Sequence, residues 1–322
     1  MRITEKNQYI VDYPGINKVE ENISEYVDIF NQYGILCFRG ARLDDEEAVL
    51  VLDVMSKHFS WTPYSINTKN NGPTWKYTQN YDSAIAVDES LSLDESNNLM
   101  INRWHTEGVY SKNPHRAAGW NMRNFKCDSK FGQTGFVNAS EIVKDMPSEL
   151  VEFLRSAELM HYPPIVHGMP TPMNEFVEKF TSSVNNMERE IWCNDGPRDI
   201  PSYPHPAIEI HEELGCEVLR LCPCVEQWGP NQVLFSVNGD SPTSSDLLTF
   251  NRCVEWLENA LSIESNHWWH EWEEGDFLIP DLFVMIHSAR AGFGIGDREF
   301  DGFWCFEKGT DSPPDGVIKA RQ

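Results

Sequence analysis

Apolar positions near the start of the chain recur with the period of a helix. Ile23, Val27 and Phe30 follow the i, i+4, i+7 spacing that places side chains on one helical face. We therefore expect an amphipathic helix from Glu21 to Tyr33. Gly34 follows it directly, and glycine is the residue that most readily takes the left-handed conformation of a C-cap.

The pattern then changes from helix to strand and back again. Ile35–Phe38 is a short apolar run between two glycines, which predicts a buried strand. A second helix is expected from Asp44 to Phe59, because acidic residues open it and Val49, Leu52 and Met55 share one face.

The rest of the chain predicts mostly short strands. Two further helices are expected, at Pro147–Ala157 and Ser245–Leu261. Strands are expected at Gly135–Asn138, Ala207–Ile210, Glu217–Leu221, Trp268–Trp272, Phe277–Ile279, Phe283–Ile286 and Phe300–Phe306. Many short strands with a few helices outside them predict a mainly β fold with flanking helices, built as a barrel or a sandwich.

Two long stretches interrupt this pattern. Residues 66–103 are rich in Asn, Ser and Asp and predict a long loop with one strand. Residues 163–204 hold seven of the 19 prolines and predict an irregular insertion with a helix at about 174–190. Long loops in compact domains often serve as lids, so we expect two lid-like insertions in one domain spanning residues 1–322.

The charge balance narrows the range of partners. The chain has 26 Lys and Arg against 50 Asp and Glu, a net charge of −24. Nucleic-acid phosphates and anionic membrane surfaces would repel such a chain, so neither is an expected partner. An anionic small molecule would instead need a placed Arg or Lys. No apolar leader and no apolar run of about 18 residues is present, and we expect a cytoplasmic protein without a membrane span.

The eight cysteines do not form a metal motif. None has the CxxC spacing, and a single residue separates Cys222 from Cys224, which is a poor spacing for zinc. We expect reduced and mostly buried thiols.

The segment Trp104-His105-Thr106-Glu107 carries the clearest chemistry. A histidine and a carboxylate at i and i+2 of a strand project from the same face, so His105 and Glu107 would approach one metal ion together. His287, at the end of a distant apolar strand, would complete a set of two histidines and one carboxylate. That facial arrangement leaves positions open for a 2-oxo acid and dioxygen and is typical of non-haem Fe(II) oxygenases. By itself H-x-E is a weak signal, and His105 is equally compatible with a structural histidine of the core.

Arg298 is the expected cation for an anionic co-substrate. A turn through Gly292, Gly294 and Gly296 would return the chain so that Arg298 faces the same interior as His287. Its fork of donors suits a carboxylate. The alternative is a surface arginine paired with a neighbouring acid, and the spacing leaves both interpretations open.

Five segments in order along the chain resemble the taurine dioxygenase/TfdA-like family of Fe(II)/2-oxoglutarate dioxygenases. They are Tyr33–Gly40 (YGILCFRG), Trp104–Gly108 (WHTEG), Gly132–Asn138 (GQTGFVN), His205–Gly215 and Glu273–Ile279 (EEGDFLI). The ordered set is more specific than any one motif and extends over almost the whole chain.

This resemblance implies a double-stranded β-helix (jelly-roll) core with flanking helices. It implies Fe(II) bound by His105, Glu107 and His287, and 2-oxoglutarate as co-substrate with its far carboxylate on Arg298 and Thr134. It also implies hydroxylation of a small-molecule substrate by dioxygen, with succinate and CO₂ as co-products.

The chain also departs from the family pattern. Glu107 stands where Asp is commoner, and Pro280–Phe283 stands where the family has W-D-N-R. In taurine dioxygenase a second Arg follows the first by four positions and holds the sulfonate. Gly302 occupies that position here, which argues against taurine as the substrate.

The two insertions and the strand near the metal residues are expected to line the substrate pocket. Asn102, Arg103 and Arg290 are candidate substrate contacts, with a structural role as the alternative for each.

Two other functions are compatible with the residues. One is a catalytically silent jelly-roll binding protein, which loss of a ligand would mark, although all three are present. The other is a zinc-dependent hydrolase, which consumption of 2-oxoglutarate would distinguish from an oxygenase.

Overall fold

The computed structural model describes most of the chain. Backbone is described for residues 8–63, 76–79, 100–109, 113–127, 131–161, 190–193, 196–199, 203–221, 233–290, 293 and 296–308. Side chains are described for the same residues except 76–79, 100–103, 190–193, 196–199 and 233–234.

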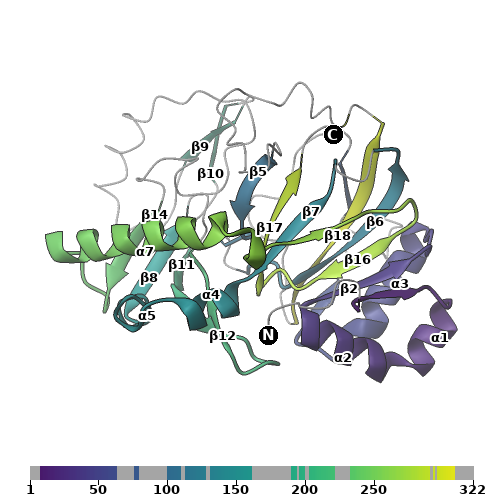
Figure 1. Ribbon diagram of the computed structural model, residues 1–322, viewed down its shortest axis with the longest axis horizontal. Helices are drawn as coiled ribbons and strands as arrows, with labels where there is room; N and C mark the ends of the chain where they lie inside the picture. The colour runs from purple at the N-terminus through teal and green to yellow at the C-terminus, as the bar shows by residue number, and fades with distance from the viewer. Residues whose placement is uncertain are drawn as a thin grey trace.

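Two curled β-sheets form the core of the molecule (Figure 1). Within the described residues the larger sheet has seven strands, in the order β1-β2-β16-β6-β18-β3 with β4 also paired to β18. Its strands are β1 (Ile10–Asp12), β2 (Ile35–Arg39), β3 (Trp61–Pro63), β4 (Lys76–Gln79), β6 (Ala117–Phe125), β16 (Phe277–Pro280) and β18 (Arg298–Glu307). The smaller sheet has the order β15-β7-β17-β5, with β5 (Met100–His105), β7 (Thr134–Asn138), β15 (Trp268–His270) and β17 (Met285–Arg290).

The inner faces of these sheets contact each other. Trp120 of β6 stacks on Phe136 of β7 with ring centroids 6.0 Å apart, which joins one sheet to the other. The fold is a mainly β jelly-roll core with flanking helices, so the fold class predicted from the sequence is confirmed.

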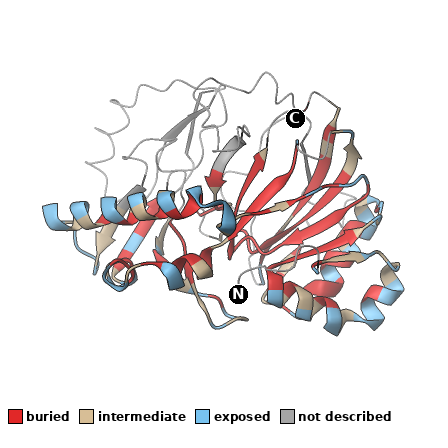
Figure 2. Ribbon diagram, in the orientation of Figure 1, coloured by how far each residue is buried: buried red, intermediate tan, exposed pale blue. Residues whose placement is uncertain are grey.

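Three helices cover the outer face of the larger sheet: α1 (Ile16–Glu21), α2 (Ile23–Tyr33) and α3 (Asp45–Ser56). Val51 and Leu52 of α3 are fully buried in one cluster with Phe38, Phe277 and Phe303 of the sheet. Figure 2 shows buried strands beside helices that expose one side to solvent. The apolar stripe of each helix is therefore what attaches it to the sheet.

The other described elements form the opposite side of the molecule. They are α4 (Ala139–Asp145), α5 (Ser148–Arg155), α7 (Ser244–Ser262), the 3₁₀ turn η3 (Glu264–Asn266), and the strands β8 (Ala157–His161), β9 (Glu190–Cys193), β10 (Gly196–Asp199), β11 (Pro204–Pro206), β12 (Ile208–Ile210), β13 (Glu217–Leu219) and β14 (Val233–Val237). Buried residues of α4, α5 and α7 belong to the same apolar cluster as the inner faces of the two sheets.

Local sequence signals located the helix ends well. Gly34 caps α2 with φ +69, and Asp44 forms a capping box with Glu47 at the start of α3. The helices expected at Pro147–Ala157 and Ser245–Leu261 are α5 and α7. Helices α1 and α4 were not predicted. The helix expected at 174–190 and most of both insertions lie outside the described residues.

Three expectations have separate outcomes. Cys37, Cys127, Cys216, Cys253 and Cys305 are free thiols, while the other three cysteines lie outside the described side chains. No helix of the described residues is long and apolar enough to cross a membrane. The single-domain organisation over residues 1–322 stays a prediction.

Candidate functional site

The two histidines of the candidate metal set lie on neighbouring strands. His105 is the last residue of β5, and His287 lies in β17, the strand that pairs with it. The two residues are directly opposite in the antiparallel register, and their ring centroids are 4.1 Å apart. Strand pairing therefore brings together two residues that are far apart in the sequence.

Glu107 reaches the same place from a turn. The expectation that His105 and Glu107 share a strand face is wrong, because β5 ends at His105 and residues 107–109 form a turn. Gly108 takes a left-handed φ of +67 in this turn. It packs against the ring of His115, which lies just before β6 and is 1% exposed. The turn, and not strand alternation, directs Glu107 toward the histidines.

The three side chains form a compact donor set. Glu107 Oε2 is 3.8 Å from His105 Nε2 and 3.7 Å from His287 Nε2. One donor atom from each residue lies within 4.8 Å of the others. Two imidazoles and one carboxylate at such distances suit a divalent cation with open coordination positions.

The electrostatics agree with that interpretation. Burial raises the pKa of Glu107, and His105 offsets only part of the rise. Burial, with His105 as a further cause, lowers the pKa of His287 well below its ordinary value, so this imidazole stays neutral and its nitrogen is available to a cation. A bound cation would stabilise the carboxylate that burial otherwise disfavours.

Aromatic side chains line the space next to His287. The ring of Trp120 has its centroid 5.4 Å from that of His287, and the ring of Phe136 lies 6.4 Å away. Phe300 of β18 continues this wall, 6.1 Å from Trp120. The Arg298 guanidinium carbon in turn lies 4.8 Å from the Phe300 ring centroid. These side chains therefore form a continuous wall between the candidate metal residues (His105, Glu107 and His287) and Arg298.

Arg298 is a buried cation and not a surface residue. It is 2% exposed and begins β18. Its Nε donates to the carbonyl of Gly132 at 2.8 Å, and one terminal nitrogen donates to Thr134 Oγ1 at 3.1 Å. The same hydroxyl oxygen accepts from Trp272 Nε1 at 3.0 Å. The two residues predicted to bind a carboxylate thus lie together, held by fixed neighbours.

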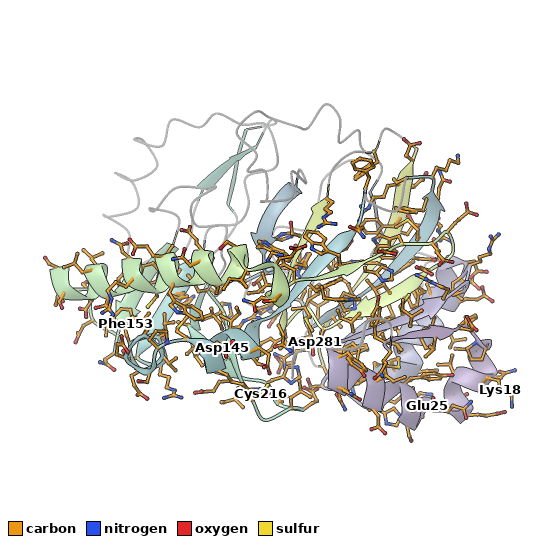
Figure 3. The ribbon with its side chains drawn as sticks, viewed as in Figure 1. Lys18, Glu25, Asp145, Phe153, Cys216 and Asp281 are labelled. Carbon is orange, nitrogen blue, oxygen red and sulfur yellow. The ribbon has the colours of Figure 1, made fainter. Side chains whose placement is uncertain are left out.

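A buried ion pair holds the turn that precedes β17. Asp281 Oδ2 lies 2.7 Å from His211 Nε2, and Asp281 Oδ1 accepts from the backbone N–H groups of Phe283 and Val284. Asp281 lies at the lower edge of the core in the view of Figure 3. His211 therefore connects the β12–β13 hairpin to the strand that carries His287.

The predicted substrate contacts have different outcomes. Asn102 and Arg103 lie in β5, but their side chains are outside the described part of the chain. Arg290 extends over the ring of Trp269, 4.0 Å from its centroid, and also bonds to Gln133. Trp269 packs on Trp104, the neighbour of His105, so this cluster occupies the face of the sheet opposite the metal residues. Substrate contact by Arg290 stays a prediction that this placement does not favour.

Several residues that shape the site carry no distinctive signal in the sequence. Four aromatic residues lie in strands or loops whose apolar character is typical of any core: Trp120, Phe136, Phe300 and Trp272. His115 has both ring nitrogens buried, and neither has a hydrogen-bond partner within the described part of the chain. Burial lowers its pKa to about 3. Only Asp281 had a signal, since it retains the aspartate of the family segment before His287.

Fold and site together define a jelly-roll protein with two histidines and one carboxylate gathered beside a buried arginine. The family model described as taurine catabolism dioxygenase TauD, TfdA family matches residues 4–304. The chain therefore belongs to the TauD/TfdA dioxygenase family, as its motifs predicted.

Solved structures support the fold. A taurine dioxygenase from Burkholderia xenovorans is 15% identical, with a TM-score of 0.58 over 91% of this chain and 83% of that one. The PvcB protein from Pseudomonas aeruginosa, described as an Fe, alpha-ketoglutarate dependent oxygenase from an isonitrile synthetic pathway, is 14% identical. Its TM-score is 0.53 over 89% of this chain and 81% of that one. No curated protein matches the sequence.

Proposed function

We propose that the protein is an Fe(II)- and 2-oxoglutarate-dependent dioxygenase that hydroxylates a small-molecule substrate. The observation that carries the proposal is the convergence of His105, Glu107 and His287 within 4.8 Å on the scaffold of a dioxygenase family. Bound iron and 2-oxoglutarate would supply the chemistry, in which dioxygen converts 2-oxoglutarate to succinate and CO₂ and oxidises the substrate.

The residues of this chain have distinct roles in the proposal. His105, Glu107 and His287 hold the metal and leave one side of it open. Arg298 and Thr134 bind the far carboxylate of 2-oxoglutarate, because Arg298 is a buried cation whose position is fixed by Gly132. Trp120, Phe136 and Phe300 keep water away from the space between the two groups.

The substrate is a separate question within this proposal. Gly302 stands where a sulfonate-binding arginine would be required for taurine, and it lies opposite the core residue Trp120 in the β6–β18 pair. We propose a small molecule other than taurine, with Asn102 and Arg103 as the first residues to vary.

The test is succinate formation from 2-oxoglutarate by wild-type protein and His105→Ala. Each protein is loaded anaerobically with Fe(II) and then exposed to air. Slow turnover without substrate in the wild type, absent in His105→Ala, would support the proposal. If neither Fe(II) nor 2-oxoglutarate binds to the wild type, the oxygenase proposal is wrong and a silent binding protein is favoured.

A control separates an oxygenase from a zinc hydrolase. Loading with Zn(II) in place of Fe(II) should abolish succinate formation, because zinc has no accessible redox change. Succinate formation that does not depend on iron would contradict the proposed reaction.

A further inference from the structure

A column of aromatic rings leads away from the metal residues into the core. Next to His287 is Trp120, whose ring centroid is 5.4 Å away. Phe136 stacks between Trp120 and Trp268, with centroid distances of 6.0 Å and 5.1 Å and interplanar angles of 23° and 21°. Tyr9 meets the far side of Trp268 edge-on, with a centroid distance of 4.1 Å. The column thus runs from one sheet to the other and then to the segment before β1.

Tyr9 ends the column in a polar cluster whose members are buried except for the partly exposed Arg39. Its hydroxyl lies 3.2 Å from His270 Nδ1, and both residues are at most 1% exposed. His270 Nε2 lies 3.3 Å from Asp276 Oδ2. Arg39 donates to both oxygens of that carboxylate, at 3.1 Å and 3.0 Å. Residues from the segment before β1, from β2 and from the β15–β16 region therefore meet in one row of polar groups.

The protonation states of this row follow from its surroundings. Burial lowers the pKa of His270, and Asp276 offsets only part of this, so the imidazole is neutral. Burial alone would raise the pKa of Asp276, but the neighbouring His270 ring and the hydrogen bonds from Arg39 outweigh it, so the pKa is lowered and the carboxyl is ionised. In the tautomer that carries its proton on Nε2, the nitrogen nearer Asp276, Nδ1 is the acceptor for the Tyr9 hydroxyl.

The same cluster is a poor metal site. Cys37, His270 and Asp276 have donor atoms within 4.8 Å of one another. However, Asp276 accepts two bonds from Arg39 and a third from the backbone N–H of Glu273. Burial also raises the pKa of the Cys37 thiol well above its ordinary value, which disfavours the thiolate that a metal requires. The row is arranged to move a proton and not to hold an ion.

We propose that Tyr9 is a redox site that donates an electron through Trp268 and Trp120 to the metal centre when dioxygen reacts without substrate. This inference rests on the proposed function, since dioxygen reacting with bound iron and 2-oxoglutarate is the oxidant. One electron leaves the phenol and reduces the oxidised centre by one equivalent, and the phenol proton moves to His270 Nδ1. The products are a neutral tyrosyl radical and an imidazolium next to Asp276.

Each part of the cluster serves this reaction. Burial raises the pKa of Tyr9, so the phenol keeps its proton until it is oxidised and then needs a base. His270 is that base, and the ionised Asp276 stabilises the imidazolium. The tryptophans divide the path into shorter steps, with Phe136 as the stacked bridge between them. Oxidation is thereby transferred from the aromatic wall of the site to Tyr9. Trp120 is then protected from oxygenation.

The test is electron paramagnetic resonance on samples frozen after air reaches protein loaded with Fe(II) and 2-oxoglutarate, without substrate. Succinate is measured in the same samples. The wild type should form succinate and a tyrosyl signal. Tyr9→Phe, which keeps the ring and removes the phenol, should lose the signal and gain oxygen addition at Trp120 in peptide mass maps.

Two further variants separate a redox role from a structural one. Tyr26→Phe is the matched control, since Tyr26 is buried against Phe38 outside the column, and it should keep the signal. Trp268→Phe should weaken the signal while succinate formation persists. Tyr26→Phe removes one hydroxyl and Trp268→Phe replaces one buried ring, so the unfolding midpoint of each variant is measured to check that it is folded.

The outcomes are distinct. Succinate without a tyrosyl signal in the wild type, or a signal that persists in Tyr9→Phe, overturns the redox proposal alone. The absence of succinate overturns the proposed function, and the redox proposal with it. Loss of the signal only in Tyr9→Phe and its weakening in Trp268→Phe support the assignment.

Discussion

Gly108→Ala tests how the turn after His105 positions Glu107. Gly108 has a φ of +67, and a Cβ atom built there would lie 2.9 Å from His115 Cε1 and closer still to Nδ1. A left-handed φ costs an alanine about 1–2 kcal/mol. Overpacking against a buried ring adds about 1–3 kcal/mol. We therefore expect the free energy of unfolding to fall by about 2–5 kcal/mol in total.

The chain offers a matched control in Gly40. Its φ is +66, but a Cβ atom there would have no atom within 4 Å, so Gly40→Ala should cost only about 1–2 kcal/mol. The assay is urea unfolding of both variants without metal. In a His115→Ala background Gly108→Ala should also cost only about 1–2 kcal/mol, because the ring is gone.

The same substitution should weaken metal binding. Displacing the turn moves Glu107, so the affinity for Fe(II) should fall in Gly108→Ala and not in Gly40→Ala. If the two alanine variants lose equal stability, or if the His115→Ala background leaves the cost unchanged, the packing argument for this turn is refuted.

Three other predictions follow from the site. Thr134→Val removes the hydroxyl that is proposed to donate to the far carboxylate of 2-oxoglutarate, and leaving that carboxylate oxygen without a donor costs about 1–3 kcal/mol. Calorimetry on anaerobic metal-loaded protein should therefore show a 2-oxoglutarate Kd at least about fivefold higher, and an unchanged Kd would contradict the role of Thr134. Burial alone would lower the pKa of His211, but its bond to Asp281 outweighs this and the pKa is raised above 6.5. The stability that this pair contributes is therefore complete below about pH 6.5 and is lost as the pH rises through the raised pKa. His211→Gln should lower the urea midpoint of unfolding more at pH 6 than at pH 9. Equal shifts at the two pH values would disprove the charged pair. Finally, Mn(II) at about 100 times its Kd should stabilise the wild type by about 2.7 kcal/mol, an effect that a chelator reverses and that His287→Ala lacks; equal stabilisation of both proteins would exclude His287 as a ligand.

Local chemistry made much of the fold predictable. Gly34 and Asp44 mark helix ends because a left-handed cap and a capping box each depend on a few adjacent residues. The apolar run before Gly40 became β2 for a similar reason. Contacts between distant segments, such as Arg39 with Asp276, have no such local signal.

The candidate site shows where strand alternation helps and where it fails. Alternation from His287 directs Arg290 to the opposite face of the sheet, and the structure places it over Trp269, while its role as a substrate contact stays a prediction. The same rule did not apply to Glu107, because β5 ends two residues earlier. The ordered motifs predicted the jelly-roll class, which the structure confirms, and the candidate metal residues, whose role stays a prediction. The aromatic wall depends on packing that one sequence does not display.

The cross-strand pairing of His105 with His287 has a consequence for how the chain reaches its native state. β17 can join β5 only after the long intervening chain has closed its loop, an entropic cost that slows non-local sheet formation. In a partly folded molecule the three candidate metal-binding side chains are therefore present but not yet close together. Acquisition of the metal would follow the last steps of folding, and time-resolved metal capture would report when β5 and β17 come into register.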